Sequence, residues 1–193
     1  GFPLEAVNDA GYNVACVGQK TYNGVAVLSK RPIDVLARAL PGDPDKLPYR
    51  KGVGALVFNQ QGLVLVGRRI DTAEEAWQLP QGGVDDDEKP RQALLRELTE
   101  EIGTDKFEIL AKAPRWFTYD VPAPMRAHLW GGGYRGQKQR WFAVRFTGEE
   151  EDIDLAASHD PEFNEWRWVR IETLPHFAVA FKRRLYEDLV SEF

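Results

Sequence analysis

Three glutamates near the middle of the chain have a spacing that suits a metal site. Glu100 and Glu101 follow Glu97 by three and four residues, so in a helix both side chains meet that of Glu97 on one face. Like charges at this spacing destabilise an isolated helix by roughly a few tenths of a kcal/mol, unless a cation lies between them. Carboxylate oxygens are the ligands that Mg²⁺ prefers, and metals held this way commonly serve phosphate chemistry. The spacing therefore indicates a divalent metal site, and a solvated acidic face is the alternative.

A helix between Asp87 and Gly103 must hold these glutamates. Asp87 is a favourable N-cap, Pro90 is tolerated in a first turn, and Gly103 is a favourable C-terminal stop. At about 100° per residue, the apolar residues fall on one stripe that would face the core, beside the acidic face. This stripe comprises Leu94, Leu95, Leu98 and Ile102.

The acidic segment also matches a longer pattern. Gly82 and Glu88 precede Arg96 and Glu97, and the segment closes on Gly103. The arrangement resembles the Nudix box, Gly-x5-Glu-x7-Arg-Glu-U-x-Glu-Glu-x-Gly-U, in which U is a bulky aliphatic residue. A pattern of this length in a fitting loop and helix favours the metal site over the solvated face. The chain is therefore identified by its resemblance as a Nudix hydrolase.

The resemblance implies roles for the residues of the box. Glu97, Glu100 and Glu101 would bind Mg²⁺ or Mn²⁺, and Gly82 would let the backbone turn so that a carbonyl reaches the metal. Arg96 would pair with a box glutamate and orient it. The alternative for Arg96 is a surface ion pair that contributes less than about 1 kcal/mol.

Three further positions bear on the box. Glu162, in the segment PEF at 161–163, would add a carboxylate from a distant loop. By the resemblance it acts as a metal ligand or as the general base, a role that Glu101 could also fill. Glu88 is expected to support the loop and the helix start instead of binding metal. Thr104 stands where the family usually has an aliphatic residue, which affects packing and not chemistry.

Motifs outside the box narrow the resemblance to one branch of the family. Over residues 49–193 the chain is similar to bacterial RNA pyrophosphohydrolases and dinucleoside polyphosphate hydrolases. The branch implies metal-dependent hydrolysis of phosphoanhydrides, either at RNA 5′-triphosphate ends or in diadenosine tetraphosphate. A catalytically silent sensor that binds nucleotides or RNA ends is the alternative. The motifs are WQLPQGGV at 77–84, GQKQRWF at 136–142, PEFNEWRWV at 161–169 and FKRRLY at 181–186.

Basic and aromatic residues supply candidate substrate contacts. Tyr119 and Phe181 could stack on a base, as aromatic side chains do in single-strand recognition. Core packing is the alternative for both rings. For Phe181 this alternative has a specific basis, because the residue also belongs to an apolar stripe. The candidate phosphate contacts are Arg50, Arg68, Arg69, Gln137, Lys138, Lys182 and Arg183.

Residues 1–45 resemble an internal segment of bacterial exonuclease III. Short strands are expected at 14–17 and 25–28, and the proline-rich stretch 41–48 reads as a linker. That nuclease family needs an Asp-x-Asn motif, which this chain lacks, and about 45 residues are too few for its fold. We therefore expect residues 1–48 to form a hairpin-like appendage without activity of its own. It is expected to pack on the main domain or on a neighbouring chain.

Residues 49–193 are expected to form one α/β domain. Strands precede the acidic helix, further strands follow it, and a second amphipathic helix is expected over 177–190. This order suits a mixed sheet between helices, and the Nudix fold is such an α/β/α sandwich. The expected strands are 52–58, 63–67, 107–111, 116–119, 140–146 and 165–169.

Composition limits the class of protein. The 193 residues are 43% hydrophobic and 28% charged, which is typical of a globular domain. No stretch is long and apolar enough to predict a membrane span. The single cysteine, Cys16, suggests a reducing compartment such as the cytoplasm. A net charge of −5 argues against broad binding to duplex DNA.

Overall fold

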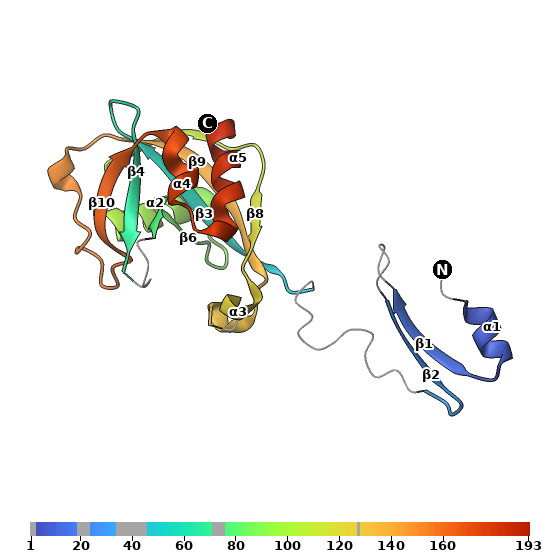
Figure 1. The fold of residues 1–193 in the computed structure, drawn as a ribbon. Helices are drawn as coiled ribbons and strands as arrows, with labels where there is room; N and C mark the ends of the chain where they lie inside the picture. Colours follow the sequence, from blue (N-terminus) through green and yellow to red (C-terminus); the bar gives the residue numbers. More distant parts are fainter. Residues whose placement is uncertain (1–2, 19–23, 34–45, 71–75, 127) are drawn as a thin grey trace. The chain divides into compact units, whose positions relative to one another are not determined.

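The computed structural model describes residues 3–18, 24–33, 46–70, 76–126 and 128–193 (Figure 1). The chain divides into two compact units, Gly1–Asp43 and Pro44–Phe193. Most of the expected linker, residues 41–45, lies outside the described residues.

The first unit is a helix followed by a hairpin. Helix α1 covers Leu4–Asp9, and strands β1 (Asn13–Gly18) and β2 (Gly24–Ser29) pair antiparallel. Both expected strands are therefore confirmed, whereas the helix was not predicted. None of the described side chains in this unit is buried. Without a buried core, the unit gains little hydrophobic stabilisation of its own.

The second unit is built on a mixed sheet. Its central strands, β3 (Tyr49–Phe58) and β9 (Gly136–Phe146), run parallel, and every other pairing in the sheet is antiparallel. The strand order is β10-β4-β3-β9-β7, with β5, β6 and β8 pairing β4, β3 and β9. All six expected strands are present with shifted ends. The remaining strands are β4 (Val64–Arg69), β5 (Trp77–Gln78), β6 (Gln81–Gly83), β7 (Phe107–Lys112), β8 (Phe117–Asp120) and β10 (Phe163–Val169).

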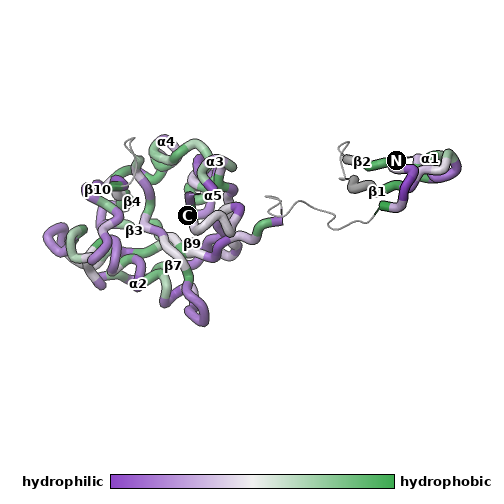
Figure 2. The backbone as a smooth tube through the Cα atoms, turned by 90° about the horizontal axis from the view of Figure 1, so that it is seen from below, coloured by the Kyte–Doolittle hydropathy of each residue, from purple (hydrophilic) through white to green (hydrophobic). Residues whose placement is uncertain are grey.

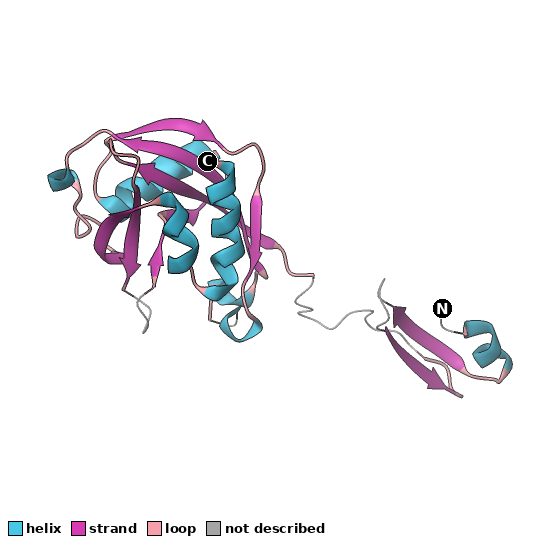
Figure 3. Cartoon of the chain, turned by 45° about the horizontal axis from the view of Figure 1, so that its top comes forward, coloured by secondary structure: helices cyan, strands magenta, loops and turns pink. Residues whose placement is uncertain are grey.

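Two helices cover opposite faces of this sheet (Figure 3). Helix α2 (Pro90–Ile102) packs its apolar side on one face, and helix α5 (Arg183–Glu192) packs on the other. Two buried clusters result, one on each side of the strands, and hydrophobic stretches are visible along β4 and around α4 (Figure 2). The α/β/α sandwich with a mixed sheet is therefore confirmed. Short helical segments are α3 (Ala123–Arg126), η1 (Trp130–Gly132), η2 (Glu150–Asp152), η3 (Ile171–Thr173), α4 (Leu174–Phe177) and η4 (Ala180–Lys182).

Helix α2 differs from expectation at its start and on its apolar face. Asp87 is not the N-cap: it adopts a left-handed φ of 65°, and Lys89 takes the cap position. The side chain of Gln92 then accepts a hydrogen bond from the Lys89 amide at 3.2 Å. Leu95 is 37% exposed and does not belong to the buried stripe. Ala93, Leu94, Leu98 and Ile102 form that stripe instead. Gly103 ends the helix as predicted, with φ 79°.

The continuous helix predicted over 177–190 is wrong. Helix α4 stops at Phe177, Ala178 and Val179 are extended, and α5 begins only at Arg183. The four-residue apolar repeat misled the prediction because residues on both sides of the break pack against the same cluster. The break turns Lys182 inward, where its side chain is buried. Within the described residues, no helix is long and apolar enough to cross a membrane.

Candidate active site

Helix α2 brings Glu97 against a glycine of β6. A Cβ atom at Gly82 would lie 1.8 Å from the carboxyl carbon of Glu97, so only glycine leaves room for this carboxylate. Burial raises the pKa of Glu97, and the neighbouring Arg96 partly opposes that shift. The acidic helix and the glycine loop are therefore packed against each other at this point.

Glu101 is the most enclosed of the box glutamates. Only 4% of it is exposed, and its Oε2 accepts a hydrogen bond from the backbone amide of Gln81 at 2.9 Å. Within the described residues its Oε1 has no hydrogen-bond partner. Burial raises the pKa of Glu101 well above its usual value, and the nearby charges of Glu162 and Glu97 raise it further. A buried carboxylate with a free oxygen is suited to receive a cation.

Arg96 holds the acidic segment together. Its guanidinium donates to Glu88 at 2.9 and 3.0 Å, to Glu97 at 3.0 Å and to Glu100 at 3.2 Å. It also donates to the carbonyl oxygen of Gly83 at 3.1 Å. The predicted pairing with box glutamates is therefore present. The hydrogen bonds from Arg96 lower the pKa of Glu88, which supports the loop as expected.

Glu162 comes from the segment that precedes β10. Its backbone carbonyl accepts from the Ile70 amide at 3.0 Å, which ties this segment to the end of β4. Its carboxylate lies 3.5 Å from the Arg69 guanidinium. Two pockets meet at this residue, because Glu162 and Glu97 line both of them. Glu100 and Glu101 line only one of the two, which we call the acidic pocket because its lining includes Glu97, Glu100, Glu101, Asp160 and Glu162.

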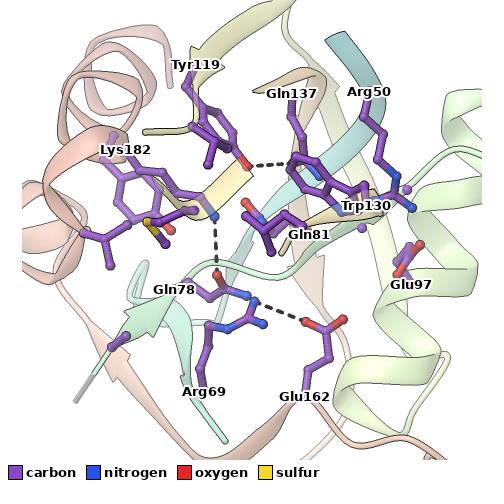
Figure 4. A pocket seen from close by; sticks show the side chains of 18 of the residues that line it. Arg50, Arg69, Gln78, Gln81, Glu97, Tyr119, Trp130, Gln137, Glu162 and Lys182 are labelled. Carbon is purple, nitrogen blue, oxygen red and sulfur yellow. Dashed lines mark hydrogen bonds and ion pairs between the residues drawn. The ribbon is translucent and has the colours of Figure 1, made fainter. Parts of the chain in front are cut away.

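The other pocket has a volume of about 320 Å³, and we call it the cationic pocket because arginine and lysine side chains line it (Figure 4). Arg50 and Arg69 line it from β3 and β4, and Lys182 lines it from the break before α5. Lys182 is 8% exposed, and its Nζ lies 3.5 Å from the side-chain oxygen of Gln78. The ammonium is 5.2 Å from the ring centre of Tyr119, within range of a cation–π interaction.

Tyr119, Gln137 and Gln81 form the inner wall of this pocket, and the fully buried Gln139 supports two of them by hydrogen bonds. The Tyr119 hydroxyl donates to the side-chain oxygen of Gln137 at 2.8 Å. The Gln139 amide donates to the same oxygen at 2.8 Å and to Gln81 at 3.3 Å. Burial raises the pKa of Tyr119, so its hydroxyl stays protonated. The wall is therefore neutral and rich in hydrogen-bonding groups.

Four of the predicted substrate contacts do not line this pocket, namely Arg68, Lys138, Phe181 and Arg183. Arg68 points to the other side of β4, where it binds Asn164 at 2.9 Å and Glu165 at 3.1 Å. Lys138 lies on the opposite side of β9 from Gln137, because successive side chains of a strand alternate. Phe181 packs its ring 5.9 Å from that of Tyr119 and lines a separate surface hollow.

The carboxylates have the chemistry of a divalent-metal site without a completed ligand set. Within the described residues, no group of three or more Asp, Glu, His or Cys side chains is already gathered around one point. The free Oε1 of Glu101 and the mutual effect of Glu97 and Glu162 on its pKa nevertheless fit a divalent cation. Mg²⁺ commonly takes only one or two carboxylates and completes its shell with water and phosphate oxygens.

Comparison with known proteins identifies the family. Residues 48–189 match the model of the NUDIX domain. The chain belongs to the Nudix family. Enzymes of this family generally use divalent metal ions, in agreement with the acidic site described above.

Curated Nudix relatives are similar over almost their whole length. The RNA pyrophosphohydrolase of Gluconacetobacter diazotrophicus is 49% identical over 158 residues, which cover 78% of this chain and 95% of that protein. The RNA pyrophosphohydrolase of Rickettsia rickettsii is 50% identical over 147 residues, which cover 76% of this chain and 91% of that protein.

Solved structures of other proteins share the fold. An E. coli dihydroneopterin triphosphate pyrophosphohydrolase has a TM-score of 0.59 and 20% identity, covering 76% of this chain and 99% of that one. A C. elegans Ap4A hydrolase in a binary complex has a TM-score of 0.51 and 18% identity, covering 72% of this chain and 96% of that one. At such low identity the likeness shows the fold alone.

Several pocket residues of this Nudix domain were missed by sequence reasoning. Gln78 and Gln81 belong to the motif WQLPQGGV, which was used only for its resemblance. Gln139 does not line the pocket but donates hydrogen bonds to Gln81 and Gln137, which do. It shares the face of β9 with Gln137, so period-two alternation could have found it. Trp130 lies 5.6 Å from the Arg50 guanidinium, and no pattern in the sequence indicates this contact.

Proposed function

We propose that this Nudix protein removes pyrophosphate from RNA 5′-triphosphate ends in a metal-dependent hydrolysis. Relatives named RNA pyrophosphohydrolase are 49% and 51% identical to it and are covered over 95% and 87% of their lengths. All the glutamates of the Nudix box are present. A cytoplasmic location rests on the single cysteine and is part of the same proposal.

One observation carries the proposal: the acidic and the cationic pocket meet at Glu97 and Glu162. A 5′-triphosphate is a polyanion attached to a base and needs both environments. Its phosphates need cations and a metal, whereas its base needs a ring or a hydrogen-bonding wall. The cationic pocket supplies a ring in Tyr119 and a hydrogen-bonding wall in Tyr119 and Gln137.

The metal is Mg²⁺ or Mn²⁺ in this proposal. Glu97, Glu100, Glu101 and Glu162 would hold it together with the backbone carbonyl of Gly82. When bound, such an ion neutralises charge on the phosphate oxygens and lowers the pKa of its water. Because no three of these ligands are already gathered among the described residues, the site suits ions that bind together with substrate phosphates.

The side chains of the protein supply the remaining steps. Arg50, Arg69 and Lys182 would bind the phosphates and compensate charge that develops during in-line attack. Glu101 or Glu162 would accept the proton of the attacking water. Arg96 would act by positioning Glu97 and not by touching the substrate, because its donors are already engaged.

Diadenosine polyphosphates are the second candidate substrates. They carry the same phosphoanhydride and a base, so the same two pockets could hold them. Hydrolysis of diadenosine tetraphosphate would release ATP and AMP. A second base, in place of an RNA chain, is the chemical difference between the two substrates.

Incubation with each substrate tests the proposal. The purified protein is given 5′-triphosphate RNA or diadenosine tetraphosphate with Mg²⁺ or Mn²⁺, and pyrophosphate and ATP are measured. We expect pyrophosphate from 5′-triphosphate RNA and a markedly lower kcat/KM for diadenosine tetraphosphate. Arg170→Ala, an exposed cation outside both pockets, is the control and should match the wild type. Binding without product from either substrate would instead favour a silent sensor.

A further inference from the structure

A second group of cations lies on the side of β9 that faces away from the cationic pocket. Gln137 and Gln139 face the pocket side and are buried, so Lys138 and Arg140 face the other side. The parallel register pairs Lys138 with Lys51 of β3, which puts both side chains on that same side. Strand β7 lies on the other edge of β9, and its Lys112 pairs with Phe142. Phe142 is two residues from Arg140 and therefore on the same side of β9, so Lys112 lies on that side as well. We call Lys51, Lys112, Lys138 and Arg140 the basic patch.

An aromatic ring lies within the basic patch. The Arg140 guanidinium lies 4.7 Å, and the Lys138 ammonium 5.7 Å, from the ring centre of the half-buried Trp116. Arg140 also donates hydrogen bonds to the carbonyl oxygens of Ala113 at 2.8 Å and Pro114 at 3.0 Å. Its guanidinium is therefore held in place against the ring. The patch combines a positioned cation, an indole ring and exposed lysines.

Among the residues that the structure describes, the cations of the basic patch have no carboxylate partner. Nearby arginines behave differently: Arg135 pairs with Asp120, and Arg115 pairs with Glu192. The protein as a whole carries a net charge of −5. An uncompensated basic cluster on an acidic protein indicates a site for an anionic partner.

We propose that the basic patch binds the body of a single-stranded RNA, downstream of the 5′ end held in the pocket. Phosphates would contact the lysines, and a base would stack on Trp116. Cations alternating with an aromatic ring are the usual means of holding a single strand without reading its sequence. This inference rests on the proposed RNA substrate.

The placement of the basic patch predicts a dependence on RNA length. Arg50 and Gln137 line the pocket, and their chain neighbours Lys51 and Lys138 belong to the basic patch. The two sites therefore share the beginnings of β3 and β9 but lie on opposite sides of the sheet. An RNA chain must pass around the end of these strands to reach the basic patch. A triphosphorylated dinucleotide is too short to do so, whereas a longer oligonucleotide can.

Binding of RNA that lacks a triphosphate tests the surface independently of catalysis. The probe is a 5′-hydroxyl oligoribonucleotide of about a dozen nucleotides, followed by fluorescence anisotropy at several salt concentrations. The Lys51→Ala/Lys138→Ala protein should bind it at least about fivefold more weakly. The slope of log K against log salt should shrink by about 1.4, or about 0.7 for each lost phosphate contact. Arg170→Ala removes an exposed cation that follows β10, and it should bind as the wild type does.

Kinetics on two substrate lengths provide the second readout. In the double variant, KM for the long 5′-triphosphate RNA should rise about fivefold, while kcat stays unchanged. Turnover of the triphosphorylated dinucleotide should match the wild type. Both lysines are exposed, so folding should be preserved, and circular dichroism verifies this.

The outcomes separate this inference from the proposed function. Wild-type protein that binds the 5′-hydroxyl RNA through the basic patch but releases no pyrophosphate would overturn the function and not the surface. Equal RNA binding by the wild type and the double variant would overturn the surface, whatever the turnover. The surface proposal also fails if an acidic peptide displaces the RNA at lower concentration than unlabelled RNA does, because the preferred partner would then be a protein.

Discussion

The carboxyl group of Glu97 occupies the space that a side chain at position 82 would need, since a Cβ at Gly82 would lie 1.8 Å from the Glu97 carboxyl carbon. We therefore expect Gly82→Ala to displace this glutamate, lower kcat by more than about tenfold, and destabilise the fold by about 1–3 kcal/mol through overpacking. Pyrophosphate release and urea unfolding measure the two effects. Gly133→Ala is the matched control, because its Cβ would meet only one atom, at 3.7 Å. A fully active Gly82→Ala protein would show that Glu97 need not occupy this position.

Arg96 joins Glu88, Glu97 and Glu100 with the Gly83 carbonyl, so its planar fork should matter as well as its charge. Arg96→Met should leave these carboxylates uncompensated and destabilise the protein by about 1–2 kcal/mol, a figure discounted because its side chain is one-third exposed. Arg96→Lys keeps the charge but cannot bridge all the acceptors, so it should recover stability better than kcat. Chemical unfolding and steady-state kinetics measure the two. Identical kcat in wild type and Arg96→Lys would contradict a positioning role.

Acid sensitivity should depend on Asp120. The hydrogen bond from Arg135 holds the pKa of Asp120 below its usual value, and the bond from Tyr49 adds to this. A carboxylate whose folded pKa is lowered contributes stability above its unfolded pKa, and this contribution is lost as pH falls through the folded value. Asp120→Asn should therefore be less stable than wild type near neutral pH. The two proteins should converge only once pH falls below the usual aspartate pKa of about 3.9 and through the lowered folded pKa, which unfolding curves at several pH values would reveal. A gap that stays constant with pH would contradict this assignment.

Removal of residues 1–47 should leave hydrolysis within about twofold of the full chain, because the described side chains of the first unit are not buried. The Nudix match also begins only at residue 48. Turnover of 5′-triphosphate RNA by the full and shortened proteins provides the comparison. Complete loss of turnover in a shortened protein that still unfolds cooperatively would contradict the separation of the two parts.

The parts of the site that lie within one helix could be predicted from the sequence. Glu97, Glu100 and Glu101 share a face because helical geometry alone determines their spacing. Gly103 could be recognised as the stop because a left-handed residue there favours glycine. The prediction of Asp87 as the N-cap was wrong. The path of the preceding loop puts Lys89 at the cap position instead, and no local sequence pattern specifies that path.

The parts that depend on packing between elements could not be predicted in the same way. Lys182 reaches the pocket only because the helix expected over 177–190 is broken, and apolar periodicity is the same on both sides of the break. Gln139 is fully buried through hydrogen bonds to Gln81 and Gln137, which come together only when β6 and β9 flank β3. Arg68 and Arg69 are adjacent and both basic, and only the pairing of β4 decides which one faces the pocket.

Pyrophosphate release from 5′-triphosphate RNA by wild type and Glu101→Gln, with Mg²⁺ present, tests the central claim most directly. Glutamine can still accept the Gln81 hydrogen bond made at 2.9 Å, so the fold and the melting temperature should be preserved. Loss of the buried charge should remove the metal-dependent reaction and lower kcat by at least about a hundredfold. A folded Glu101→Gln protein that releases pyrophosphate at the wild-type rate would contradict the account.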